Sequence, residues 1–147
     1  DIVPTQSVDI KKTTIRDYNG YFDRALVDAP CSGLGVLRRN PDTKWRRKPS
    51  DVPRMAAKQK KILNAAANLV RPGGILVYAV CSCEKEENED VVFSFLDKRK
   101  DFSIDNDNCS DTLKLFKTET GCYRTYPKTI ILDGFFMARL IRKQKQG

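Results

Sequence analysis

Two short apolar runs, separated by a long amphipathic segment, constrain the fold of this chain more than any other feature. The first run lies at residues 25–27 within YFDRALVDAP, and the second at residues 75–80 within ILVYAVCSC. Both are typical of buried strands in a parallel sheet. Between them, a helix is expected to begin near residues 50–53, where serine and aspartate precede a proline, and to stop at the Pro-Gly-Gly of residues 72–74. This order predicts a parallel βαβ unit.

The rest of the pattern extends this unit to an α/β domain. After the second run, apolar residues predict one face of a second helix: Val91, Val92, Phe95 and Leu96. Beyond residue 100, GCYRTYP and GFFMARLIRK are typical of strands, and the link at residues 128–135 suits an antiparallel hairpin that closes the sheet edge. A chain of 147 residues is long enough for one core, so we expect a single domain.

Composition narrows the class of protein. The net charge of +8 favours a polyanionic partner, nucleic acid first, because binding to phosphates releases counterions. No apolar stretch reaches the about 18 residues of a membrane span, and we expect a monomeric, cytoplasmic protein without a membrane partner. The sequence has no histidine, which excludes Ser-His-Asp and Cys-His nucleophile pairs. Five irregularly spaced cysteines do not indicate a disulfide framework, so reduced thiols are expected.

Both predicted strands end in turns that contain cysteine, Cys31 in DAPCSG and Cys81 in AVCSC. Ligands of parallel sheets bind beyond the carboxyl ends of the strands, so both thiols should lie at one edge. A helix N-terminus after such a turn would lower a thiol pKa, although the acidic residues after Cys83 would oppose thiolate formation. A zinc half-site at Cys81 and Cys83 lacks a partner CxxC or histidine. Burial as small hydrophobic residues suits Cys109 and Cys122 better than the two turn cysteines.

A basic segment at residues 38–54 surrounds the only tryptophan, with seven basic residues against two aspartates. Basic side chains for phosphates beside an aromatic ring for stacking are typical of RNA contact. Arg38, Arg39 and Lys44 are therefore predicted to bind RNA. Trp45 either stacks on a base or packs on the protein.

These motifs resemble those of the Nol/Nop/Sun family of S-adenosylmethionine-dependent RNA (cytosine-5) methyltransferases. The resemblance is carried by FDRALVDAPCSGLGVLRRNPDTKW, by RPGGILVYAVCSCEKEENEDVV and by DGFFMARL. It is nearest to the bacterial Sun (Fmu) branch, which modifies small-subunit ribosomal RNA. The likeness implies a Rossmann-like methyltransferase fold, S-adenosylmethionine as the methyl donor and ribosomal RNA as the substrate.

The resemblance also implies roles for individual residues. Carbon 5 of cytosine is a poor nucleophile, so a thiolate must first add to carbon 6. The family's attacking cysteine matches Cys81, and the cysteine that assists breakdown of the covalent adduct matches Cys31. Asp28 is expected to be buried beside the cofactor methyl, with a raised pKa suited to protonating or hydrogen-bonding N3 of the base. Asp28, Pro30 and Asp9 are the expected cofactor-binding residues, Asp9 toward the adenine end.

The sequence departs from the family pattern in several places. Val80 stands where the family more often has threonine. The residues directly before Asp133 are TIIL, whereas the family usually has polar residues there. Residues 133–136 are therefore expected to have a structural role only. Gly33-x-Gly35 lacks the third glycine of a dinucleotide loop and instead predicts a turn that lets backbone and base approach closely.

The glycine-rich cofactor loop of the family is not found upstream of residue 21. Residues 1–147 are therefore expected to be the C-terminal portion of a catalytic domain, inactive when isolated. The alternative function is a noncatalytic RNA-binding module that keeps the fold.

Overall fold

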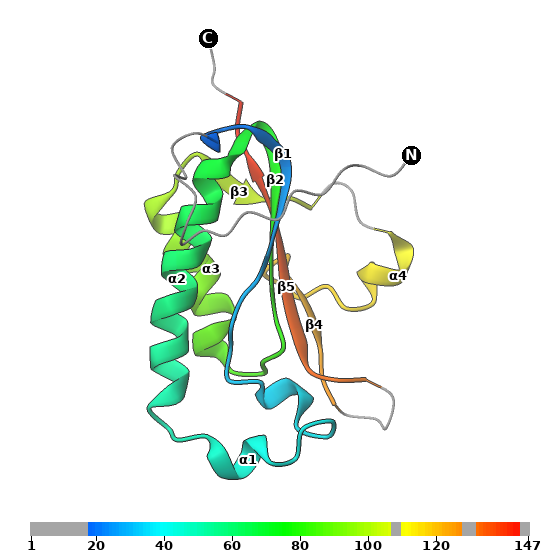
Figure 1. The fold of residues 1–147 in the computed structure, drawn as a ribbon. Helices are drawn as coiled ribbons and strands as arrows, with labels where there is room; N and C mark the ends of the chain where they lie inside the picture. Colours follow the sequence, from blue (N-terminus) through cyan, green and yellow to red (C-terminus); the bar gives the residue numbers. More distant parts are fainter. Residues whose placement is uncertain (1–17, 107–109, 128–131, 145–147) are drawn as a thin grey trace.

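A mixed sheet of five strands forms the centre of the computed structural model, which describes residues 18–106, 110–127 and 132–144 (Figure 1). The strand order is β1-β2-β5-β3, and β4 also pairs with β5. The strands are β1 (Phe22–Asp28), β2 (Val70–Val80), β3 (Phe102–Ile104), β4 (Tyr123–Thr125) and β5 (Phe135–Arg142).

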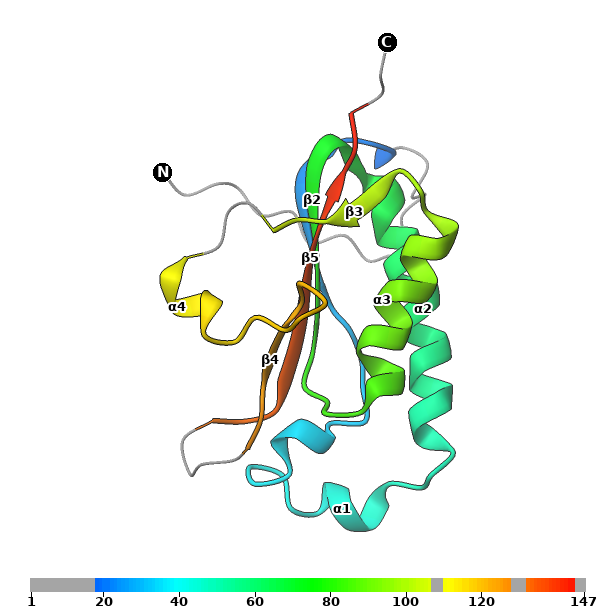
Figure 2. The same ribbon diagram turned by 180° about the vertical axis from the view of Figure 1, so that it is seen from behind.

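The predicted βαβ unit is confirmed. Strands β1 and β2 are parallel, with Val27 opposite Tyr78, and helix α2 (Asp51–Leu69) connects them. Helix α3 (Glu89–Lys98) follows β2 and carries the predicted apolar face. The two helices lie side by side against one face of the sheet in both views (Figures 1 and 2). Their apolar side chains and those of β2 and β5 form the core, which includes Leu63, Leu76, Val92 and Leu140.

The Pro-Gly-Gly segment acts differently from the prediction. Helix α2 already ends at Leu69, and β2 begins at the next residue. The pairing with β1 then jumps from Phe22 opposite Val70 to Arg24 opposite Ile75, so β2 has extra residues at this point. Gly73 has a φ of 78°, which favours glycine. The helix breakers therefore form a bulge inside the strand instead of a loop before it.

Strand β5 lies in the interior of the sheet, not at its edge. It pairs antiparallel with β2 on one side and with β3 and β4 on the other. The antiparallel pairing of the two predicted late strands is confirmed, with Tyr123 opposite Met137. The short strand β3 was not predicted. Part of the predicted hairpin link, residues 128–131, lies outside the described residues.

The prediction that β1 is a buried strand is wrong for the part of the chain that the structure describes. Strand β1 is at the end of the strand order and pairs only with β2 there. Val27 faces the helices and is buried, whereas Leu26 is 69% exposed on the opposite face. An apolar run of three residues cannot distinguish an edge strand from a central one, because both can be apolar.

Several short elements complete the chain. They are the 3-10 helices η2 (Leu34–Val36) and η3 (Lys85–Glu87) and the single-turn helices α1 (Thr43–Arg46) and α4 (Asp111–Lys114). Turns η2 and η3 follow β1 and β2, so they lie at the carboxyl end of the parallel pair, at the lower end of the sheet in Figure 1. None of the described helices is long and apolar enough to cross a membrane.

Candidate active site

The two turn cysteines meet at the carboxyl ends of β1 and β2. The Sγ atoms of Cys31 and Cys81 are 3.2 Å apart, within hydrogen-bond distance for two sulfur groups. Both side chains are partly exposed, so a ligand can reach them. The prediction that parallel strands bring both thiols to one edge of the sheet is confirmed.

The environment keeps Cys31 protonated. Burial, the hydrogen bond with Cys81 and the electrostatic interaction with Cys81 raise the pKa of Cys31 to about 12. The sequence left the competing effects on the thiol pKa open; for Cys31 burial dominates, and the following helix η2 has only three residues. Helix α3 begins eight residues after Cys81, with η3 between them, so no helix starts directly after that cysteine.

Three loops pack tightly around the cysteine pair. The Gly35 amide donates to the Cys81 carbonyl at 3.1 Å, and the Gly134 amide donates to the Gly35 carbonyl at 2.8 Å. A Cβ atom at Gly35 would collide with the Gly134 carbonyl, and one at Gly134 with the Cys83 sulfur. The two glycines thus allow the loops to approach closely, and residues 133–134 have the structural role expected of them.

Replacing Gly35 by alanine is expected to lower the free energy of unfolding by about 1–3 kcal/mol, because the new methyl group forces two backbones apart. Calorimetric melting of the full-length protein measures the loss. Asn40→Ala is the control, since Asn40 is exposed in the following turn. Equal melting temperatures for both variants would contradict the close approach of the loops.

Two of the three expected cofactor residues, Asp28 and Pro30, lie at the same edge. Asp28 ends β1 and Pro30 precedes Cys31, and both are exposed. The prediction that Asp28 is buried is wrong within the described residues, because no described element covers the outer side of β1. Asp9 lies outside the described residues.

The basic segment follows Cys31 and folds back onto the loop before β5. Arg38 and Arg39 both contact Asp133, with nitrogen to oxygen distances of 3.4 and 2.5 Å. Both guanidinium groups remain exposed, whereas the Asp133 side chain is buried. The Lys44 ammonium lies 5.2 Å from the centre of the Trp45 ring, and that ring is 82% exposed. Trp45 therefore does not pack on the described part of the protein.

The sequence analysis missed a buried polar cluster behind the two cysteines. The carboxylate of Glu87 is fully buried and accepts hydrogen bonds from Ser32, Ser82 and Gln59. Glu87 belongs to the acidic run after Cys83, which was considered for its effect on thiolate formation. The repeated Cys-Ser dipeptide, at residues 31–32 and 81–82, is the sequence signal that could have indicated the cluster.

The other cysteines have different surroundings. Cys122 is fully buried, as predicted, and burial raises its pKa. Burial also raises the pKa of Cys83. Cys109 lies outside the described residues. Across residues 18–106, 110–127 and 132–144, no group of three metal-ligating side chains could hold a metal ion.

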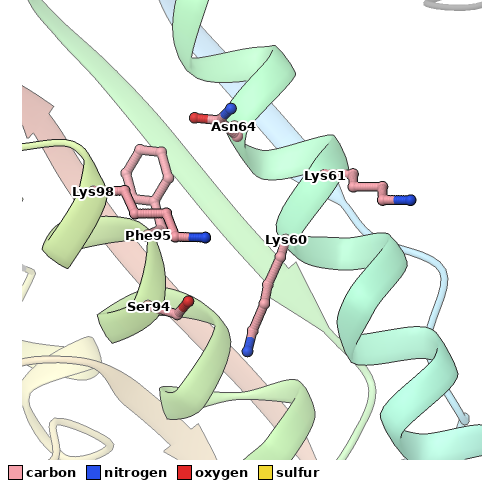
Figure 3. Close-up of a pocket in the computed structure, with 6 residues that line it drawn as sticks. All are labelled: Lys60, Lys61, Asn64, Ser94, Phe95 and Lys98. Atoms are coloured by element: carbon pink, nitrogen blue, oxygen red, sulfur yellow. The ribbon is translucent and has the colours of Figure 1, made fainter.

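Two pockets lie away from the cysteine pair. One, of about 170 Å³, lies between α2 and α3 and is lined by Lys60, Lys61, Asn64, Ser94, Phe95 and Lys98. Figure 3 shows Lys60 and Lys98 extending toward this space and Lys61 pointing away from it. The other, of about 260 Å³, is mainly apolar and is lined by residues of α4, β4 and β5. Neither pocket contains a thiol or a carboxylate, so the cysteine pair is the better candidate for catalysis.

Comparisons with known proteins show the family and the fold of this chain. The family described as 16S rRNA methyltransferase RsmB/F matches residues 3–141. The probable ribosomal RNA small subunit methyltransferase B of Bacillus subtilis (strain 168) is 37% identical over 145 residues, which are 97% of this chain and 32% of that protein. The ribosomal RNA small subunit methyltransferase B of Cronobacter sakazakii (strain ATCC BAA-894) is 42% identical over 83% of this chain and 27% of that protein.

Solved structures show the same fold. The crystal structure of PH0851 superposes with a TM-score of 0.79 at 32% identity, covering 92% of this chain and 30% of that one. The structure of NSun6 from Pyrococcus horikoshii with SFG has a TM-score of 0.65 at 31% identity, covering 82% and 30%. The predicted Rossmann-like methyltransferase fold is thus confirmed, and the chain spans about a third of the length of these relatives. Because the family match extends over residues 3–141, the chain belongs to the RsmB/F family of 16S rRNA methyltransferases.

Proposed function

We propose that the full-length protein transfers a methyl group from S-adenosylmethionine to carbon 5 of a cytosine in small-subunit ribosomal RNA. The observation that carries the proposal is the pair of thiols 3.2 Å apart at the carboxyl edge of the sheet. Its relatives from Bacillus subtilis and Cronobacter sakazakii are described as ribosomal RNA small subunit methyltransferases. Because the chain spans about a third of these relatives, the activity belongs to the whole protein, of which these residues form the cysteine site.

The two thiols have different roles in a covalent mechanism. The Cys81 thiolate adds to carbon 6, and the electron pair of the carbon 5–carbon 6 bond becomes available at carbon 5 for bonding to the methyl group. Solvent water then takes the carbon 5 proton, the electron pair of that carbon–hydrogen bond re-forms the carbon 5–carbon 6 double bond, and the carbon–sulfur bond breaks with its electron pair returning to Cys81. The neighbouring Cys31 thiol, protonated because its pKa is about 12, donates a hydrogen bond to that sulfur.

The residues at the end of β1 fit a role beside the methyl donor. S-adenosylmethionine supplies the methyl group as an electrophilic sulfonium when it is bound. Asp28 and Pro30 are exposed at the carboxyl end of β1, which is where ligands of such sheets bind. The Asp28 carboxyl would also hydrogen-bond N3 of the base, which makes addition to carbon 6 easier. The solved relative with SFG, an analogue of S-adenosylmethionine, supports this choice of cofactor.

Mass spectrometry of the full-length protein with 5-azacytosine-substituted ribosomal RNA and S-adenosylmethionine tests the proposal. The nitrogen at position 5 of this base has no proton to lose after methylation, so the adduct persists. We expect RNA attached at Cys81. Attachment at another cysteine would contradict the assigned roles, and RNA binding without any adduct would favour a noncatalytic RNA-binding protein.

Trp45 offers a separate test of RNA contact. Trp45→Ala is expected to weaken RNA binding by a factor of about 5–100, the loss of one stacked base. The melting temperature should not change, because the ring is 82% exposed. Fluorescence anisotropy with a labelled fragment of small-subunit ribosomal RNA measures the affinity.

Leu115→Ala is the matched control, since Leu115 is equally exposed at 81% but follows α4, far from the basic segment in sequence. We expect its RNA affinity to equal that of the wild type. An equal loss in both variants, or none in either, would contradict stacking by Trp45.

A further inference from the structure

The carboxylate of Glu87 is the centre of the cluster that connects the two cysteine turns. Its side chain has no exposed surface and accepts four hydrogen bonds. Oε1 accepts from the Ser32 amide at 2.8 Å and from the Gln59 side-chain amide at 3.1 Å. Oε2 accepts from the hydroxyl groups of Ser32 and Ser82 at 2.5 and 2.6 Å. These four donors suit an ionised carboxylate, which is an acceptor only.

The two serines are placed alike around this carboxylate. Each directly follows one of the paired cysteines, and each donates its hydroxyl to the same oxygen of Glu87. Each hydroxyl also accepts an amide from the residue two positions later, Leu34 in one turn and Glu84 in the other. One carboxylate therefore connects both turns through the serines that follow the two cysteines.

Glu87 is itself held firmly in place. Its carbonyl accepts the Tyr78 hydroxyl at 2.7 Å, and its amide donates to the Glu84 carbonyl at 3.1 Å. The Gln59 side chain that donates to the carboxylate also donates to the Pro30 carbonyl. Strand β2, helix α2 and turn η3 thus all hold the group that joins the turns.

A buried carboxylate without a cation among its described contacts costs free energy, and charge-assisted hydrogen bonds offset only part of that cost. An apolar side chain would fill the same space at less cost but could not connect two separate turns. The connection needs an acceptor with two lone pairs on each oxygen. This requirement gives the charge a role beyond packing.

We propose that Glu87 is a positioning residue, which holds Cys31 and Cys81 at the separation that the methyl transfer needs. The inference rests on the proposed function for its substrate, but the thiol separation can be measured without RNA. Glutamine at this position keeps the size and removes the charge. Its NH₂ group cannot accept the two hydrogen bonds that a carboxylate oxygen accepts, so two donors of the cluster lose their acceptor and the connection weakens.

The test compares Glu87→Gln with Glu86→Gln in the full-length protein, since Glu86 is the exposed neighbour in the same turn. The first readout is thiol exchange with oxidised glutathione. Cys31 and Cys81 lose two protons and two electrons to form a disulfide, and each glutathione disulfide becomes two thiols. We expect the equilibrium constant to fall at least about tenfold for Glu87→Gln, equivalent to ~1.4 kcal/mol, and to stay unchanged for Glu86→Gln.

The second readout is the rate of adduct formation with 5-azacytosine-substituted RNA, beside RNA affinity and the circular dichroism spectrum. A slower rate with unchanged affinity and fold supports positioning. An unchanged rate, or an unchanged thiol equilibrium in a folded variant, would overturn it. If Glu87→Gln does not fold, the double variant Ser32→Ala/Ser82→Ala replaces it with the same expected results. A wild type that forms no adduct would overturn the proposed function, and thiol exchange would then decide the role of Glu87 alone.

Discussion

Replacement of Cys81 by alanine is expected to lower the rate of methyl transfer to RNA at least about 1,000-fold, the scale of losing a catalytic nucleophile. Without its sulfur, nothing in the described site can add to carbon 6 in its place, because burial, the largest cause of the raised pKa of Cys31, remains in the variant and keeps that thiol protonated. RNA affinity should be unchanged, since the basic segment is untouched. Transfer of tritium from labelled S-adenosylmethionine to unmodified small-subunit ribosomal RNA measures the rate.

Cys83→Ser is the control for Cys81→Ala, because it changes a thiol two residues away that does not contact Cys31 in the described structure. We expect it to retain its rate within about threefold, as for a residue outside the reacting atoms. If Cys81→Ala retained activity while Cys83→Ser lost it, the wrong cysteine of the CSC motif would have been assigned as nucleophile. If both lost activity together with their fold, circular dichroism would show it.

The fold was predictable where one local pattern sufficed. The apolar run at residues 75–80 and the helical spacing before it defined β2 and α2. The edge position of β1 and the interior position of β5 depend on which strands pair, and pairing is a property of distant residues. Strand β3, with only three residues, carries too short a pattern to be recognised. Proline and glycine are typical of both loops and strand bulges. Only the register of the pairing between β1 and β2 shows that the Pro-Gly-Gly segment is a bulge.

The candidate site was predictable in part. Two cysteines after two parallel strands must lie at the same edge, and this reasoning led to Cys31 and Cys81. It could not show that burial raises the pKa of Cys31, because burial depends on loops that meet in three dimensions. Glu87 was missed because it lies in a run of acidic residues, and nothing in the local sequence marks it as the fully buried one. Asp28 was expected to be buried between two strand ends, whereas β1 lies at the edge of the sheet in the described part of the chain.

Cys31→Ala is expected to make the covalent adduct accumulate, whereas Cys81→Ala prevents its formation. Addition of Cys81 to carbon 6 does not need Cys31, but breakage of the carbon–sulfur bond leaves negative charge on the Cys81 sulfur. The Cys31 thiol, 3.2 Å away and protonated at neutral pH, stabilises that charge through its hydrogen bond. Its loss should slow release of the adduct about 100-fold or more, the usual contribution of a proton donor. The protein should therefore accumulate on unmodified RNA as a complex that survives denaturing electrophoresis.

The double variant Cys31→Ala/Cys81→Ala decides whether that complex has the proposed bond. It should form no complex, because the attacking sulfur is absent, although RNA affinity remains. Cys31→Ser should accumulate less complex than Cys31→Ala, since a hydroxyl group can still donate to the Cys81 sulfur. A complex that persists in the double variant, or that forms with Cys81→Ala and not with Cys31→Ala, would reverse the roles of the two thiols. In the second case the pair at the sheet edge would still be catalytic, but Cys31 would be the nucleophile, and its pKa would have to fall when RNA binds.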